Sequence, residues 1–235
     1  MRFIYSMLVL FAFFSLSFSL PVGGENVVAG TPVSLGTQSP GTAGAWGGNI
    51  TQVNLTINSS TLHWQGFYGS VAASLRLASG SEGSVSTLKV WNVSNVSGQI
   101  YVSTSSNVDF TTINSSTATL ANVDSAFTFL SGANDAAVNT GTNSASPAFN
   151  IGQYIVYANT RPFVTTLNSS GSPVWRQVIV RDANTTTATD FVFVGLLNSS
   201  GVAYNGAAAH FQVIVPENSA GDAAVTTYYF YGEIQ

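Results

Sequence analysis

The sequence predicts an all-β protein: an antiparallel β-sandwich, immunoglobulin-like or jelly-roll in type, with an extended N-terminal arm. Three observations lead to this fold class. The apolar runs are short and rich in β-branched and aromatic residues, they tend to alternate with polar residues, and clusters of Gly, Ser and Asn separate them. Short strands with frequent turn signals are typical of sandwiches and barrels.

The first 19 residues are typical of a targeting segment. Met1–Arg2 gives a positive start, Phe3–Phe18 is almost wholly apolar, and Ser17–Ser19 offers a small-residue cleavage site. This order predicts a secretory signal peptide, and the alternative is a retained membrane anchor. No second apolar run of this length follows. We therefore expect a mature chain without a membrane span, located outside the cell or on its surface.

Residues 20–46 form the predicted arm, and residues 47–235 form the predicted sandwich domain. The arm is rich in Gly, Pro, Thr and Ser, and residues 26–36 carry no charge. Apolar residues recur within it, and these are the side chains that a donated strand would use: Val27, Val28, Val33 and Leu35. The alternative is that the arm packs as the first strand of its own sandwich.

Five strands are predicted in the first half of the domain. Residues 50–57 alternate imperfectly between apolar and polar side chains, and residues 62–71 contain the segment HWQGFYG. Residues 73–78 and 87–93 flank a Gly- and Ser-rich turn, which predicts a hairpin. Residues 99–103 (QIYVS) form the fifth strand.

One short helix is predicted in the second half. Residues 122–130 fit a helix that Asn122 or Asp124 would cap, although the same segment also suits a strand. Residues 131–146 are small, polar and rich in Gly and Asn, and they predict an exposed loop.

The last third contains a short sequence pattern that occurs twice. Asn-Ser-Ser-Gly occurs at 168–171 and again at 198–201, each time ahead of a Gln-Val-Ile-Val run, which predicts two similar hairpins. Residues 191–195 and 227–234 complete the sheet. Their nearly continuous apolar runs indicate strands with both faces partly covered.

Charge is scarce, and this excludes several classes of protein. Charged residues are 7 % of the 235, and the net charge is −4. A typical soluble domain carries about 25 %. A nucleic-acid-binding protein needs a basic surface, which this chain lacks. The absence of cysteine excludes a disulfide scaffold, a thiolate zinc site and a thiol nucleophile.

Nine Asn-x-Ser/Thr sequons occur, none with proline at the middle position. In a secreted chain this motif marks surface positions that can carry N-linked glycans. The alternative is that they are turn sequences and nothing more. The nine positions are Asn49, Asn54, Asn58, Asn92, Asn95, Asn114, Asn168, Asn184 and Asn198.

Nothing in the sequence predicts catalysis, so we expect a protein that is not an enzyme and holds no cofactor or metal. The chain has two histidines and scattered single acids, and it lacks the common hydrolase, zinc-protease and nucleotide-binding motifs. We interpret the aromatic segment 63–69 as a core strand. The alternative interpretation is a sugar-binding platform formed by His63, Trp64, Phe67 and Tyr68. The aromatic run 226–231 is either a central strand or an edge strand that pairs with another chain.

The order GGNIT-x-VNLT, HWQGFYG and VPEN…TTYYFYGEI resembles a largely uncharacterised family of archaeal secreted or cell-surface proteins. The resemblance covers residues 47–234, and its specific parts are residues 63–69 and 215–234. It implies a signal peptide, many sequons and a β-sandwich. Many relatives carry cysteines in the second half, whereas this chain has none. Any disulfide of theirs is therefore missing here.

A broader likeness is to archaeal pili and threads that assemble when a subunit's extended arm completes its neighbour's sandwich. This likeness implies a homo-oligomer or homopolymer, since strand addition supplies main-chain hydrogen bonds and side-chain pockets. We therefore expect a secreted structural glycoprotein of an extracellular filament, pilus or surface layer. The alternative is a carbohydrate-binding or adhesive cell-surface module.

Overall fold

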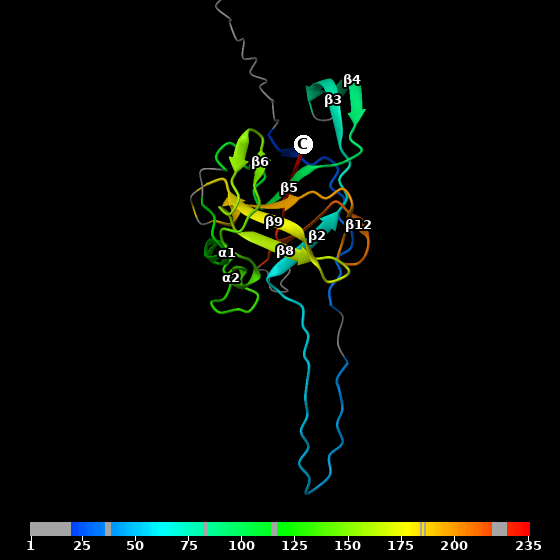
Figure 1. Ribbon diagram of the computed structural model, residues 1–235, viewed down its shortest axis with the longest axis vertical. Helices are drawn as coiled ribbons and strands as arrows, with labels where there is room; N and C mark the ends of the chain where they lie inside the picture. The colour runs from blue at the N-terminus through cyan, green and yellow to red at the C-terminus, as the bar shows by residue number, and fades with distance from the viewer. Residues whose placement is uncertain are drawn as a thin grey trace, which may run out of the picture.

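The computed structural model describes residues 20–35, 39–81, 84–113, 117–183, 185, 187–217 and 225–235. The predicted signal peptide, residues 1–19, lies outside these ranges. The predicted all-β antiparallel sandwich is confirmed (Figure 1). Its main sheet has six strands, and their order is β1 (Val22–Gly23), β14 (Tyr229–Ile234), β5 (Gly98–Ser103), β10 (Phe191–Leu196), β9 (Pro173–Arg181) and β8 (Phe163–Leu167).

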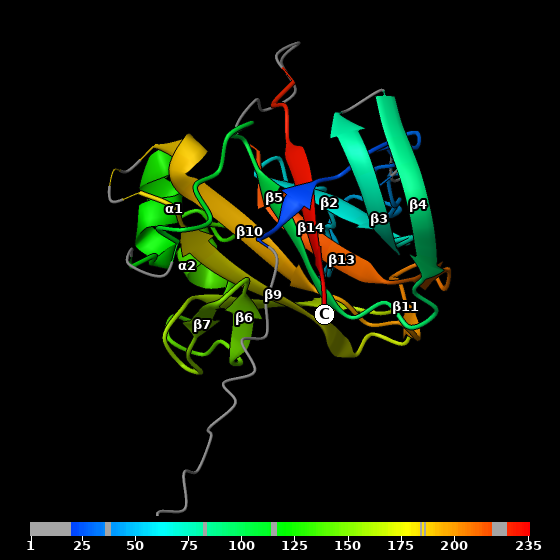
Figure 2. The same cartoon turned by 90° about the horizontal axis from the view of Figure 1, so that it is seen from above.

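A second, smaller layer covers one face of the main sheet. It consists of the antiparallel pair β2 (Trp64–Gly69) and β13 (Phe211–Pro216), together with α1 (Leu120–Ala126) and α2 (Ala137–Thr140). The buried core between the layers includes Phe191, Phe193, Ile179, Val213 and Val215. Figure 2 shows β14, β5, β10 and β9 side by side, with the two helices at one end.

The opposite face of the main sheet is also covered. Val192 and Val194 of β10 point to this side, while Phe191 and Phe193 point to the other, as the period of a strand requires. The cover comes from Phe110 and from the hairpin of β6 (Phe149–Ile151) and β7 (Tyr154–Val156). Burial on both faces explains why β10 is a continuous apolar run.

The predicted helix is confirmed, but its predicted cap is wrong. Thr119 caps α1, and its hydroxyl accepts a hydrogen bond from the Asn122 backbone N–H. Asp124 instead caps α2, because its carboxylate accepts from the Ala137 N–H at 2.6 Å. The segment 131–146, predicted as a loop throughout, therefore contains a one-turn helix that a distant side chain stabilises.

Only one of the two predicted Asn-Ser-Ser-Gly hairpins forms. The turn at 168–171 joins β8 to β9, which pair with each other. The turn at 198–201 instead leads from β10 to β11 (Gly201–Val202), which pairs with β12 (Ala208–Ala209). The second prediction is wrong because β10 finds its partners elsewhere, in β5 and β9.

The strand predicted over residues 50–57 is also wrong for the isolated chain. These residues are extended, but they pair with no other described segment, because this part of the chain projects away from the sandwich (Figure 1). A period of two makes a segment suited to a sheet, but a strand forms only where a backbone partner is within reach. Neither helix of the described residues has the length and apolar character of a membrane-spanning helix.

Candidate assembly surfaces

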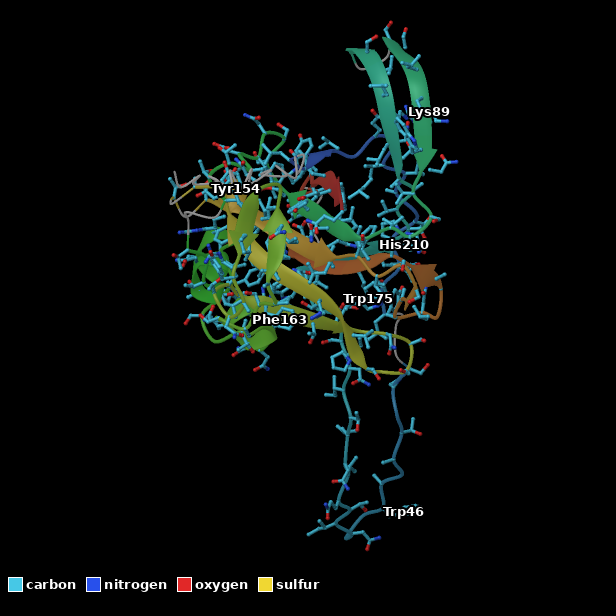
Figure 3. The ribbon with its side chains drawn as sticks, turned by 45° about the horizontal axis from the view of Figure 1, so that its top comes forward. Trp46, Lys89, Tyr154, Phe163, Trp175 and His210 are labelled. Atoms are coloured by element: carbon cyan, nitrogen blue, oxygen red, sulfur yellow. The ribbon has the colours of Figure 1, made fainter. Side chains whose placement is uncertain are left out.

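The feature most exposed to solvent is a long excursion that we call the projecting loop, residues 39–60. It leaves the sandwich, turns near Trp46 and returns to β2 (Figure 3). At the tip the Asn49 N–H donates to the Trp46 carbonyl at 3.3 Å, and Gly48 has a φ of +80°, which suits glycine. No Asp, Glu, Lys or Arg occurs between Glu25 and Arg76. The loop is therefore entirely uncharged.

The returning leg of the loop has the pattern of an amphipathic strand. Val53, Leu55 and Ile57 are 55 %, 76 % and 85 % exposed. Because side chains alternate along an extended chain, these three share one face, and Asn54 and the other polar residues share the opposite face. The face of Val53, Leu55 and Ile57 is apolar, and no described residue covers it.

One root of the projecting loop is held by Asp135. Its carboxylate accepts hydrogen bonds from the Thr61 hydroxyl and from Nδ1 of His63, the latter at 2.7 Å. Its backbone carbonyl accepts from Nε1 of Trp64 at 2.6 Å. The Thr61 hydrogen bond, followed by that of His63, holds the pKa of the Asp135 carboxyl below its ordinary value of 3.8. Two residues just before β2 and the first residue of β2 are thus hydrogen-bonded to one distant residue.

Strand β1, well before the loop in the chain, lies on the edge of the main sheet. Strand β1 pairs with β14 over two residues, and the Gly24 N–H donates to the Phe230 carbonyl at 2.8 Å. A shallow groove of about 320 Å³ lies here, between Gly23, Gly24 and Val27 on one side and residues 228–231 on the other. The aromatic run is therefore next to the edge of its sheet, with only β1 outside it.

The residues predicted to form the donor strand lie just beyond β1 in the chain. None of them belongs to a strand, and all are exposed: Val27, Val28, Val33 and Leu35. Gly30 and Pro32 interrupt the segment, and proline removes one hydrogen-bond donor from any ladder that it joins.

The predicted hairpin at 73–93 is confirmed as β3 (Ser74–Ser81) and β4 (Ser84–Asn92). Within the described residues each of these strands pairs only with the other. Leu75 pairs with Trp91, and Leu77, two residues along on the same face, pairs with Lys89. Leu75, Trp91 and Leu77 are 57 %, 49 % and 54 % exposed. We call these three residues the apolar hairpin face; its one charged neighbour, Lys89, lies on β4.

The hairpin and the projecting loop lie at opposite ends of the molecule. Figure 1, drawn with the longest axis vertical, places β3 and β4 at one end and the loop at the other. Figure 3 shows the same separation from another direction, with Lys89 of β4 and Trp46 of the loop far apart. Two exposed apolar features therefore point in opposite directions.

The edges of the β2–β13 pair differ in hydrogen bonding. The amide of Gln177, which is 1 % exposed, donates to the Ile214 carbonyl at 2.8 Å and accepts from the Ile214 N–H at 2.7 Å. A side chain of β9 thereby occupies the outer edge of β13. Strand β2 pairs only with β13 among the described residues, so its other edge is open.

The proposed sugar-platform residues do not share one exposed surface. Trp64 and Phe67 pack against the core, and His63 stacks on Phe129 at 4.8 Å between ring centroids. Tyr68 is exposed and meets the exposed Tyr204 edge to face at 5.3 Å. Of the four residues, only Tyr68 presents its ring to solvent.

Seven of the nine sequons lie within the described residues, and Asn114 and Asn184 lie outside them. Asn168 is partly exposed, and its Oδ1 accepts from the N–H groups of Ser170 and Ser172. Asn198 makes the corresponding bond to the Ser200 N–H at 3.2 Å. The other described sequon asparagines are exposed: Asn49, Asn54, Asn58, Asn92 and Asn95.

Buried carboxylates make structural hydrogen bonds. Glu233 accepts from the Tyr101 hydroxyl at 2.7 Å and from the Gly152 N–H at 3.0 Å. Burial, together with the nearby Glu233 charge, raises the pKa of Tyr101, so its phenol stays a donor. Within the described ranges no three His, Asp or Glu side chains gather as they would around a metal ion.

Two contacts that shape these surfaces were not predicted from the sequence: the Asp135 root contact and the Gln177 edge contact. Each joins residues far apart in the chain, and neither has a local sequence signal. Comparison of the chain with protein families, with curated proteins and with solved structures found no match.

Proposed function

We propose that this protein is a secreted structural glycoprotein, the subunit of an extracellular filament, pilus or surface layer, and that copies join by strand donation. The observation that carries this proposal is the returning leg of the projecting loop. It has the alternation of a strand, its apolar side chains are exposed, and no described segment of its own chain pairs with it. Exposed apolar surface of this kind marks a site of interaction with another molecule.

Two further properties support association between copies. The low charge weakens the repulsion that normally keeps copies of a protein apart. The exposed sequon asparagines offer positions where glycans would supply hydration in place of charge. Strand addition is a suitable mode because it satisfies backbone groups and buries alternate side chains together.

Negative-stain microscopy and sedimentation of the purified full-length protein test this proposal. We expect regular filaments or sheets from the parent protein and from Gln52→Asp, whose side chain lies on the polar face and belongs to no sequon. We expect soluble monomers from Leu55→Asp, which places a charge on the apolar face. A parent protein that stays monomeric at high concentration contradicts the proposal.

A second candidate function, glycan binding, is favoured by the exposed tyrosine pair. Tyr68 and Tyr204 meet edge to face, and the Asn205 side-chain amide donates to the Tyr68 hydroxyl at 2.9 Å. Aromatic faces with a neighbouring amide suit sugar rings. A glycan-array screen separates the two candidates: specific hits that Tyr68→Ala abolishes support an adhesive module, and a structural subunit gives none.

A further inference from the structure

The β3–β4 hairpin is an incomplete piece of sheet. Two-stranded ribbons are marginally stable by themselves in water, and three strands with an apolar face are ordinarily needed. Here both strands are exposed to solvent, and the apolar hairpin face of Leu75, Leu77 and Trp91 has no cover among the described residues. The hairpin therefore lacks a third strand.

The projecting loop contains a segment that could serve as this third strand. Residues 51–58 span eight positions and match the length of β3. Val53, Leu55 and Ile57 would extend the apolar hairpin face, and the polar face would stay in solvent. The sequon residues Asn54 and Asn58 lie on that polar face, so glycans there are compatible with pairing. Unlike the segment 27–35, this one has neither proline nor glycine within it.

Only one edge of the hairpin is open to regular pairing. Strand β4 carries a bulge at its register shift opposite Leu77 and Ala78, and it carries Lys89, the single lysine of the chain. Bulges and lysines are features that protect edge strands from pairing. The free edge of β3 has no register irregularity of its own, so it is the edge suited to accept a strand.

The donor must belong to a second copy. Within one molecule the projecting loop and the hairpin lie at opposite ends, and the returning leg of the loop is held at its base by Asp135 (Figures 1 and 3). A contact between opposite ends of identical molecules is heterologous. Such a contact propagates into a filament unless its rotation closes a ring.

We infer that residues 51–58 of one copy add to the free edge of β3 in the next copy and complete a three-stranded sheet. Val53, Leu55 and Ile57 then pack beside Leu75 and Leu77. This inference rests on the proposed function and identifies the two surfaces that assembly uses.

Disulfide trapping tests the contact directly. The chain has no cysteine of its own, so every cross-link must come from the introduced thiols. Leu55→Cys is combined in turn with Leu75→Cys, Leu77→Cys and Ser79→Cys, which sample one face of β3 at successive registers. Adjacent side chains on one face of paired strands lie about 4.5–5.5 Å apart between Cβ atoms, close enough for oxidation to join them. Non-reducing electrophoresis should then show a ladder of covalent oligomers for at least one pair.

Matched controls separate this contact from chance collisions. Gln52→Cys combined with the same β3 positions places the thiol on the opposite face of the donor and leaves every sequon intact, and we expect the ladder to be lost. Each single variant can form a dimer at most, and it should form none, because a head-to-tail contact brings different positions together. A ladder from the Gln52→Cys pairs equal to that from the Leu55→Cys pairs would overturn the inference.

Failure of the inference is distinguishable from failure of the proposed function. Filaments in the microscope with no ladder from any β3 pair overturn the inference and leave the proposed function standing. If Leu55→Cys forms a ladder with Gly66→Cys and with no β3 position, the acceptor strand is β2, and the inference is likewise overturned. Monomers that give no ladder but sediment with phosphatidylcholine vesicles overturn both, because the apolar hairpin face then meets a lipid surface.

Discussion

Replacing Gln177 by leucine should reveal how the outer edge of β13 is closed. The Gln177 amide makes two hydrogen bonds, of 2.8 and 2.7 Å, to the backbone of Ile214. Leucine has a similar size but can make neither, so one N–H and one carbonyl lose their partners. Two such groups cost about 2–6 kcal/mol together. The buried leucine recovers about 1–2 kcal/mol, which leaves a net loss within about 0–5 kcal/mol and centred near about 2.5 kcal/mol.

Urea unfolding followed by tryptophan fluorescence measures this loss. The free energy of unfolding should fall for Gln177→Leu while the dependence on urea concentration stays that of the parent. Gln65→Leu is the matched control, because Gln65 is exposed on β2 and its loss should change stability by less than about 0.5 kcal/mol. If both variants unfold like the parent, the idea that a side chain replaces a strand at β13 is refuted.

Three further predictions concern the loop and the sequons. Leu55→Ala should weaken each subunit contact by about 2 kcal/mol and raise the critical concentration for assembly roughly 30-fold, measured by sedimentation; an unchanged value contradicts a buried Leu55. Because the pKa of Asp135 is lowered on folding, its stabilising effect is complete above the ordinary value of 3.8 and is lost as pH falls through the lowered value. Thermal melts of Asp135→Asn should therefore lose part of the acid-induced decrease in melting temperature, and a decrease equal to the parent's counts against the root contact. Asn198→Gln should lower the intact mass of the secreted protein by one glycan, whereas an unchanged mass shows that this sequon is a turn only.

Local patterns were sufficient to predict most of the sandwich. Alternation and turn residues located β2, the β3–β4 hairpin, β5 and β10, because each of these depends on neighbours within a few residues. The same alternation predicted a strand at 50–57 that the isolated chain does not form. Periodicity identifies a segment able to join a sheet and carries no information about which partner is within reach.

The contacts that shape the candidate surfaces depend on long-range proximity. His63 and Asp135 are 72 residues apart in the chain, and Gln177 and Ile214 are 37 apart. A glutamine in an apolar run and an aspartate in a Gly- and Asn-rich stretch have no distinguishing sequence pattern. Their roles follow only from the path of the chain, which brings α2 to the start of β2 and β9 beneath β13.

The contacts at the base of the returning leg have a mechanical consequence. Tension on residues 51–58 passes directly into β2, which has six residue pairs with β13 and, at its start, the Asp135 contact. A pull along β2 would load these pairs together instead of one at a time. A chain of such subunits would therefore carry tension through the β2–β13 pair of each sandwich.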